Sequence, residues 1–237
     1  MFLLDQSISV YKSSLLQTPH GFGTKKTGDG RDIDVIQTLL NNEDTDYSSI
    51  VIPSQTHSNN VSVITSPVSE VIYKPENIDA VVTNQQGIVL TVVTADCVPI
   101  VYFDPVGNII GISHGGWKGT LEKIGQRVID DMIKMGSKQK DIVAVIGPAI
   151  DSCCYDIYGE RLRLFQSLFG DTVFKKQKSA VYLDLKKANV LTLLNAGLSR
   201  NNIDVSDLCT SCDDTEFFSN KRDQGIIGEM VSFIELQ

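Results

Sequence analysis

Two histidines and one cysteine lie at positions in the sequence that are typical of catalytic or metal-binding residues. His57 lies in PSQTHS, Cys97 ends an apolar run in TADCVP, and His114 follows seventeen residues later in SHGGWKGT. The chain has only 3 His and 5 Cys among 237 residues. Each of these three stands beside small residues at the end of an expected strand. Because binding residues gather on loops held by a rigid scaffold, the pattern indicates a functional site.

Two imidazoles and one thiol suit two kinds of chemistry. Catalytic zinc prefers nitrogen and sulfur ligands, takes three of them from the protein and keeps a fourth position open. The same groups suit a nucleophilic cysteine with a histidine base, in which case Asp96 would orient an imidazole. The zinc interpretation uses both histidines, whereas the nucleophile interpretation needs only one. The residue types alone leave both open.

Glycine-rich and basic segments are candidates for binding an anion. In HGGWKGT the glycines leave backbone amides unshielded, Lys118 adds a charge, and a helix is expected to follow. Amides, a cation and a helix N-terminus together make an anion site, although a glycine-rich turn is the alternative. The segments HGFGTKKTGDG (20–30) and FFSNKRD (217–223) are typical of solvated loops, and each is equally able to bring a cation to phosphate.

The other four cysteines form two close pairs in the sequence. GPAIDSCCYD (147–156) holds Cys153 and Cys154, which we interpret as one buried residue and one packed at a loop rather than as a redox pair. CTSC places Cys209 and Cys212 at a spacing typical of metal or redox sites, but no second CxxC accompanies it. An ordinary loop is therefore favoured there over a second metal site.

Composition restricts the class of protein. Hydrophobic content of 42% and charged content of 21% are those of a globular protein that buries a substantial core. No repeat, low-complexity tract or linker divides the chain, so we expect one domain over residues 1–237, monomeric or weakly oligomeric. The net charge of -8 argues against a nucleic-acid partner, because binding to a phosphate backbone needs clustered Lys and Arg.

The sequence also argues against a membrane location. Asp96 and Pro99 interrupt the longest apolar stretch, so no membrane-spanning segment is expected. The N-terminus has Asp5 where a signal peptide would need its apolar stretch, and it lacks a basic start. We therefore expect a cytoplasmic protein with reduced cysteines.

Strands outnumber helices and the two kinds of element are mixed, which predicts the α+β class. The turn DPVGN is expected to join two strands as a hairpin. The expected strands span 49–53, 61–64, 79–83, 88–94, 99–103, 109–113, 143–147 and the C-terminal EMVSFIEL. The expected helices run from an N-cap at Thr120 to Gly136, over 159–170, and from after Asp184 to Gly197.

Eight segments follow one another along the chain: HGF, QTHSNNV, TADCVPIVYFDP, HGGWKGT, GPAIDSCCYD, LDLKKANVLTLLNAGL, LCTSC and FFSNKRD. In this order they resemble the bacterial laccase-domain family, also called the YfiH or polyphenol oxidase family, now associated with purine nucleoside phosphorylase activity. The resemblance runs from about residue 20 to the C-terminus, and TADC with HxGWxGT is its most specific part. It implies a single-domain, four-layer α/β/β/α sandwich with mixed sheets. It also implies a zinc site made of His57, Cys97 and His114.

The resemblance implies activities as well. These are phosphorolysis of adenosine, inosine and 5′-methylthioadenosine, and hydrolytic deamination of adenosine, so the expected partners are a nucleoside and phosphate. Deamination would use zinc to activate water. Phosphorolysis would need phosphate held by zinc or by the group Lys25, Lys118 and Arg222.

Two other functions are alternatives. Older assignments in the family describe copper-dependent oxidation of phenols, so copper is the second candidate ion. One Cys and two His cannot build the several copper centres of a true laccase, which makes this a poor alternative. A metal-free Cys–His amidase or deamidase is supported only by analogy of fold.

This chain departs from the family pattern at several basic positions. The first glycine-rich loop usually reads HGFSTRxGG, but here Gly23 and Lys25 stand for the serine and the arginine. Lys118 and Lys221 also stand where arginine is usual. Lysine keeps the charge and loses the planar fork that grips phosphate, so these departures weaken the expectation of phosphate binding more than that of metal binding. Arg222 keeps the fork.

Overall fold

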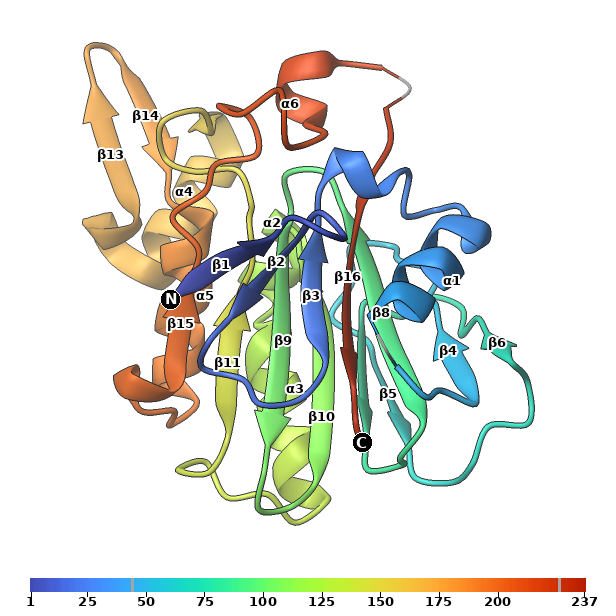
Figure 1. Cartoon of the computed structure of the whole chain (residues 1–237). Coiled ribbons are helices and arrows are strands. Elements are labelled where there is room, and N and C mark those ends of the chain that lie inside the picture. The colour runs from blue at the N-terminus through green and yellow to red at the C-terminus, as the bar shows by residue number, and fades with distance from the viewer. Residues whose placement is uncertain (44, 226) are drawn as a thin grey trace.

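Two large mixed sheets form the centre of the computed structural model, which describes residues 1–43, 45–225 and 227–237 (Figure 1). The seven-stranded sheet has the order β1 (Phe2–Asp5), β2 (Val10–Ser13), β3 (His20–Gly23), β16 (Met230–Glu235), β8 (Ile88–Thr94), β4 (Ser49–Val51) and β6 (Ile72–Tyr73). The six-stranded sheet has the order β15 (Ile203–Val205), β11 (Val143–Ile146), β9 (Val98–Asp104), β10 (Ile109–Gly115), β7 (Ala80–Thr83) and β5 (Val61–Ile64). A small third sheet has the order β12 (Asp156–Ile157), β14 (Ala180–Leu183) and β13 (Phe174–Gln177).

Helices cover the outer faces of the two large sheets, with α1 (Ile33–Asn42) on one side and α3 (Ile124–Lys134) and α5 (Leu185–Asn195) on the other, whereas α6 (Asn220–Asp223) lies beyond the sheet ends (Figure 1). The others are α2 (Trp117–Leu121) and α4 (Gly159–Phe169). Short 3-10 turns are η1 (Lys25–Thr27), η2 (Gly170–Val173) and η3 (Arg200–Asn202). Among the described residues, no helix has the length and apolar character needed to cross a bilayer.

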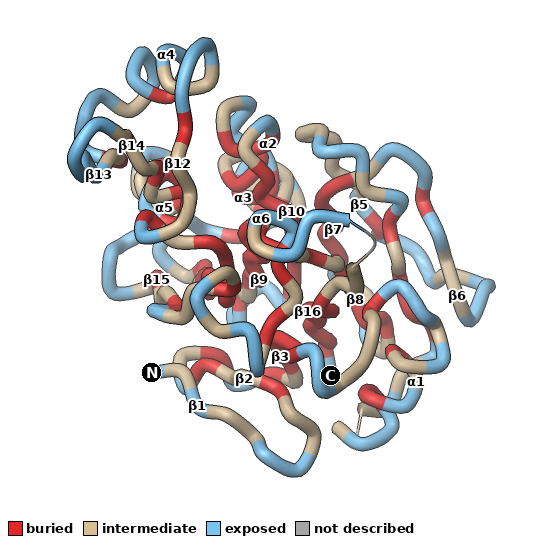
Figure 2. Tube along the Cα trace, turned by 90° about the horizontal axis from the view of Figure 1, so that it is seen from above, coloured by how far each residue is buried: buried red, intermediate tan, exposed pale blue. Residues whose placement is uncertain are grey.

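Alternation along β9 explains how the layers arise. Val101 lies in the apolar core between the two large sheets, whereas Ile100 and Tyr102 face the core shared with α3 and α5. Both faces of this strand are covered, so it is apolar throughout. On the opposite side, Ile36 and Leu40 of α1 pack on the outer face of the seven-stranded sheet. The order helix, sheet, sheet, helices confirms the predicted four-layer α/β/β/α sandwich, and Figure 2 shows the buried residues along its central strands.

Most of the expected elements are present. The hairpin through DPVGN is confirmed, with Asp104 opposite Ile109 in the register of β9 and β10. The helices over 159–170 and after Asp184 are confirmed within a residue or two of their ends.

The helix expected from an N-cap at Thr120 is wrong in two respects. A short helix, α2, already begins at Trp117, and Gly116 is its N-cap. Lys123 then adopts a left-handed conformation with φ 60°, which ends this helix before α3 begins at Ile124. Thr120 is buried inside α2, and its hydroxyl accepts a hydrogen bond from Asn189 of α5 at 3.0 Å. Packing against α5 therefore replaces the predicted capping role.

The segment HGFGTKKTGDG is not simply a solvated loop. Its first four residues form β3, a buried strand between β2 and β16. A side chain at Gly21 would put its Cβ 2.3 Å from Val10 Cγ1, so glycine is needed for the close packing there. Glycine also removes the apolar alternation by which a strand is recognised, and this explains why β3 was not predicted.

Candidate active site and metal centre

The structure brings His57, Cys97 and His114 together at one end of the two large sheets. Cys97 directly precedes β9. His114 lies in β10, opposite Pro99 of β9. His57 comes from the loop between β4 and β5 and has a left-handed φ of 59°. Their ligand atoms all lie within 4.8 Å of one another. Residues spread over 58 positions of the chain thus converge on one point.

The shape and the donors of this cluster fit a metal ion. His57 Nε2 lies 3.9 Å from Cys97 Sγ, and the two imidazoles meet edge to face with centroids 4.7 Å apart. A Cβ at Gly116 would lie 3.0 Å from His57 Cδ2 and 3.2 Å from Cys97 Sγ. Glycine therefore keeps the space beside the three donors open. Two nitrogens and one sulfur with an open side are the ligand set of a catalytic zinc site.

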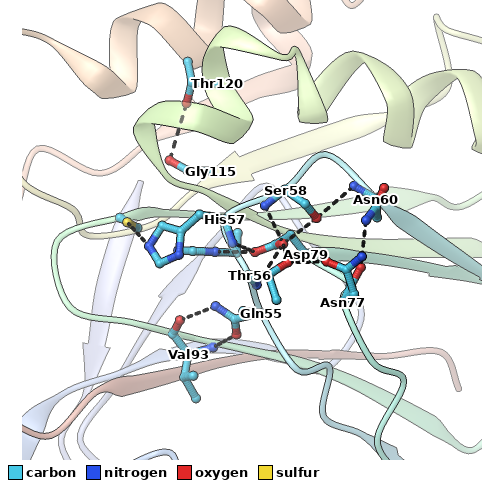
Figure 3. Close-up of polar contacts among 12 residues, drawn as sticks. Gln55, Thr56, His57, Ser58, Asn60, Asn77, Asp79, Val93, Gly115 and Thr120 are labelled. Atoms are coloured by element: carbon cyan, nitrogen blue, oxygen red, sulfur yellow. Dashed lines mark hydrogen bonds and ion pairs between the residues drawn. The ribbon is translucent and has the colours of Figure 1, made fainter. Parts of the chain in front are cut away.

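Asp79, which sequence reasoning missed, holds this geometry. Its fully buried carboxylate accepts a hydrogen bond from His114 Nδ1 at 2.8 Å. It also accepts from the backbone N–H groups of Thr56, His57 and Ser58 at 3.1, 3.0 and 2.7 Å (Figure 3). The ionised carboxylate only accepts, so His114 donates through Nδ1 and leaves Nε2 for a metal or a proton. One carboxylate thus orients both histidines.

Asp79 and its surroundings also set the charges of the cluster. Burial opposes ionisation of Asp79, but the hydrogen bonds from His114 and Ser58 prevail and hold its pKa well below the usual range. Burial would likewise lower the pKa of His114, yet the Cys97 thiolate and the Asp79 carboxylate raise it. Burial raises the pKa of the Cys97 thiol, and the two histidines lower it to about 7. In the absence of a metal, these shifts favour a thiolate on Cys97 paired with an imidazolium on His114.

The expectation that Asp96 orients an imidazole is wrong. Its carboxylate accepts hydrogen bonds from Thr210 Oγ1 at 2.6 Å, Ser219 Oγ at 3.0 Å and the backbone N–H of Lys221 at 2.7 Å. Asp96 therefore holds the segment from Thr210 to α6 in place beside Cys97. The signal for Asp79 was an acidic residue directly before the buried strand AVVT. Only the pairing of β7 with β10 shows what that carboxylate contacts.

Two hollows meet at the cluster and share His57, Cys97, Ala95 and Asn220. The first, of about 450 Å³, is rich in aromatic side chains and also holds charged groups; its lining includes Trp117, Ile150, Tyr155, Asp156, Ile157, Tyr158, Arg161, Leu185 and Lys221. The second, of about 590 Å³, is more polar; its lining includes Arg31, Gln55, Thr94, His114 and Glu229. Their size and mixed lining are those of small-molecule sites.

The three cations proposed for phosphate do not line the two hollows. Lys25 donates to the carbonyl of Asp214, and Lys118 is exposed beside the Trp117 ring, 5.6 Å from its centroid. The Arg222 guanidinium donates to the Asp223 carboxylate through two nitrogens at 2.6 Å each, and to two backbone carbonyls. None of the three side chains is among the residues described as lining either hollow. Their role in binding phosphate stays a prediction.

Two other cations do line the aromatic hollow. The Arg161 guanidinium lies 4.4 Å from the Trp117 ring centroid, and its Nη1 donates to the Tyr155 hydroxyl at 3.1 Å. Lys221 forms an ion pair with Asp156 at 2.5 Å. Arg161 was missed because it lies in the middle of an amphipathic helical pattern, where an arginine is normally a solvated surface residue.

Comparison with known proteins identifies the family of this chain. The family model described as multi-copper polyphenol oxidoreductase laccase matches residues 26–237, so the chain belongs to this family. It is 36% identical over 219 residues to purine nucleoside phosphorylase YlmD of Bacillus subtilis, which covers 87% of this chain and 79% of that protein. It is 36% identical over 201 residues to adenosine deaminase RL5 of an unknown prokaryotic organism, which covers 81% of this chain and 77% of that protein.

The solved structures show the same fold. The crystal structure of the Bacillus licheniformis hypothetical protein YfiH superposes with a TM-score of 0.90 at 33% identity, covering 100% of this chain and 99% of that one. The four-layer architecture therefore extends over the whole length of both chains.

Replacing Asp79 tests its role in the metal centre. In Asp79→Asn, His114 loses the carboxylate that fixes its tautomer, so zinc affinity is expected to fall about 10- to 100-fold in a competition titration. Ser58→Ala is the control, because it removes one donor to Asp79 at 2.7 Å and leaves the His114 contact in place. Unchanged zinc affinity in a folded Asp79→Asn protein would contradict the assignment.

Alkylation of Cys97 tests the ionisation of its thiol in protein from which a chelator has removed the metal. The thiolate forms as pH rises through a pKa of about 7, instead of the ordinary value of 9.0, so labelling by iodoacetamide should increase over that lower range. In His114→Ala the loss of the imidazolium should move the increase toward higher pH. Zinc should protect Cys97 in the parent, and peptide mass spectrometry distinguishes it from the other cysteines. Rapid labelling of the zinc-loaded protein would contradict a role as ligand.

Proposed function

We propose that this chain is a zinc-dependent purine nucleoside phosphorylase for adenosine, inosine and 5′-methylthioadenosine that also deaminates adenosine. The proposal rests on one observation: His57, Cys97 and His114, oriented by Asp79, converge at the edge of an aromatic hollow. The names of the relatives, one a nucleoside phosphorylase and one an adenosine deaminase, support this proposal.

His57, Cys97 and His114 would hold the zinc ion. Bound there, zinc supplies Lewis-acid character and lowers the pKa of water. Asp79 keeps the His114 Nε2 lone pair directed at the cluster, and it keeps the 56–58 loop in the conformation that presents His57. The protein thus orders its donors before a substrate binds, which lowers the reorganisation needed during reaction.

The aromatic hollow suits a nucleoside. Tyr155 and Tyr158 offer flat apolar faces for a purine ring, and aromatic rings pack favourably by offset stacking. Asn220 lies where both hollows meet and offers amide hydrogen bonds close to the cluster. A volume of about 450 Å³ is within the range of sites that enclose small molecules.

Arg161 is the cation best placed for phosphate. Among the described residues, its recorded contacts are with an aromatic ring and a phenol hydroxyl rather than with a carboxylate. Its positive charge is thus available to an anion in the hollow, and its planar fork suits phosphate oxygens. Lys25, Lys118 and Arg222 stay candidates for a further anion contact.

We further infer that residues 1–237 act as one catalytic domain, because β1 to β3 from the N-terminal end and β16 from the C-terminal end share one sheet. Nucleoside and phosphate are the proposed partners. A cytoplasmic location and a monomeric or weakly oligomeric state stay predictions.

The thiolate–imidazolium pair of Cys97 and His114 favours a second candidate, a metal-free cysteine–histidine amidase or deamidase. In that reaction Cys97 would be the nucleophile and His114 the proton donor, while His57 would be dispensable. Copper is the other candidate ion, since imidazole and thiolate also bind copper, and it would accompany oxidation of phenols.

His57→Ala distinguishes these candidates. It removes one zinc ligand and leaves the Cys97–His114 pair and Asp79 in place. A zinc enzyme should lose most of its bound metal and at least about 100-fold of its activity on adenosine, with and without phosphate. Full activity in a metal-free His57→Ala protein would favour the cysteine nucleophile. Phenol oxidation by copper-loaded parent, with no nucleoside turnover by the zinc form, would favour the oxidase.

Two arginine variants test how phosphate is held. Removing a charged hydrogen bond to phosphate should lower kcat/KM about 10- to 100-fold for inosine plus phosphate, and it should spare deamination of adenosine. We expect this selective loss in Arg161→Met and a smaller one in Arg222→Met, because Asp223 already occupies the Arg222 fork. Equal losses in both reactions would show that the residue supports the hollow instead of binding phosphate.

A further inference from the structure

The four cysteines outside the active site gather at one place. Cys153 Sγ lies 3.2 Å from Cys212 Sγ and 3.5 Å from Cys209 Sγ, and Cys154 Sγ lies 3.3 Å from Cys212 Sγ. All four sulfurs lie within 4.8 Å of one another. With Cys97 in the active site, every one of the 5 cysteines in the chain belongs to a candidate metal cluster.

Strand pairing explains why two distant segments meet here. β11 and β15 are parallel neighbours, with Ile146 opposite Val205, so both strands end at the same edge of the sheet. The loop after β11 carries Cys153 and Cys154, and the loop after β15 carries the CTSC turn. A further parallel bridge between Ala149 and Cys209 keeps the two loops side by side beyond the strands.

Apolar packing does not account for the cluster. Cysteine is among the most often buried residue types, but here Cys153 and Cys212 are exposed, and the other two are half-buried. The expectation that one of the vicinal pair is buried is therefore wrong. The backbone N–H of Asp151 points at Cys209 Sγ at 3.3 Å, which would stabilise negative charge on that sulfur.

The spacing of the sulfurs fits a single tetrahedral ion. Zinc–sulfur bonds of about 2.3 Å in a tetrahedron put the sulfurs about 3.8 Å apart, close to the distances found here. A disulfide needs about 2.05 Å between sulfurs, and all five cysteines are free thiols in this structure. An iron–sulfur cluster spreads four cysteines over two or more irons, which needs more widely spaced sulfurs than one ion does.

We propose that Cys153, Cys154, Cys209 and Cys212 bind a second zinc ion in a closed four-thiolate site. Four protein ligands leave no open position, so this ion is structural rather than catalytic. It holds the 151–156 segment to the 209–221 segment.

Those two segments form walls of the aromatic hollow. Tyr155 and Asp156 directly follow the vicinal cysteines. Asn220 and Lys221 lie in α6, which comes after the CTSC turn in the chain. The Asp156–Lys221 ion pair joins the same two walls at 2.5 Å, but both side chains are 42% exposed, and such a pair adds little stability. The zinc ion therefore adds a link between the walls to those made by the Ala149–Cys209 bridge and by Lys186.

Counting zinc in two matched variants tests this site. Protein purified under reducing conditions with zinc should hold about two ions per chain in the parent and about one in Cys97→Ala. Adding Cys153→Ser and Cys212→Ser to Cys97→Ala should remove the last ion, and these exposed positions tolerate serine without disturbing the core. Adding Ser211→Ala instead, in the same turn, should keep it.

The spectrum of cobalt in the Cys97→Ala protein identifies the ligands. We expect tetrahedral visible bands and sulfur-to-cobalt charge transfer with the intensity of four thiolates, both absent once Cys153 and Cys212 are serines. A Cys97→Ala protein that binds no stoichiometric zinc, that binds iron instead, or whose mass shows disulfides under reducing conditions would overturn the proposal. Two zinc ions retained in Cys97→Ala, one of them lost with the serine changes, would support the four-thiolate site and contradict only the active-site zinc.

Substrate kinetics test what the ion does. In the otherwise wild-type chain, Cys153→Ser with Cys212→Ser should lower the thermal midpoint and raise KM for adenosine several-fold, with kcat much less affected, because the walls loosen while the catalytic cluster is intact. This measurement rests on the proposed nucleoside activity, whereas the zinc counts and the cobalt spectrum do not. An unchanged midpoint and KM in the zinc-depleted variant would overturn the structural role.

Discussion

The buried carboxylate of Asp79 is the constraint on which the active site depends. An ionised group inside a protein is unfavourable unless donors surround it, and here the donors are His114 and the backbone of the 56–58 loop. Meeting this requirement places both histidines at once. The loop carrying His57 has no regular hydrogen-bonding pattern of its own, so the carboxylate acts as its template. Asp79 therefore links β7, β10 and the β4–β5 loop in one electrostatic unit.

Polar contacts hold the walls of the aromatic hollow in addition to the apolar packing of Ile157 and Leu185 in the core. Asp96 accepts hydrogen bonds from Thr210, Ser219 and Lys221, and so holds one wall close to Cys97. On the other side, the buried Lys186 pairs with Asp151 at 2.9 Å and donates to the Ser206 carbonyl. Directional contacts of this kind define loop position more closely than apolar packing does. Cys209 adjoins both anchors, because it precedes Thr210 in the chain and its sulfur accepts from the backbone N–H of Asp151.

The family's name refers to several copper ions, but the histidines of this chain provide ligands for only one metal ion. Of the 3 histidines, His20 has both ring nitrogens engaged with backbone groups, Nδ1 with the Thr18 carbonyl and Nε2 with the Ser13 N–H. Only His57 and His114 remain as ligands, and they share one site with Cys97. These donors thus suffice for the one ion that the proposed function uses.

The sequence by itself determined the class of fold and singled out the three residues of the candidate active site. Alternation and apolar runs predicted β4, β5, β7 to β11 and β16, because these strands are covered by apolar side chains. The rarity of histidine and cysteine, with their position at strand ends, singled out His57, Cys97 and His114. The strand β3 was not predicted, because its glycines remove the apolar alternation. The spacing of apolar residues also predicted one continuous helix where the left-handed conformation of Lys123 separates α2 from α3.

Only the tertiary structure decided which groups meet. Asp79, rather than Asp96, faces the His114 imidazole because β7 pairs with β10, a relation between residues 35 positions apart. The two cysteine pairs meet because β11 and β15 are parallel neighbours, and neither pair alone carries the spacing of a four-ligand site. Local sequence encodes the propensity and burial of each element, whereas contacts between side chains depend on strand order and register, which no single segment contains.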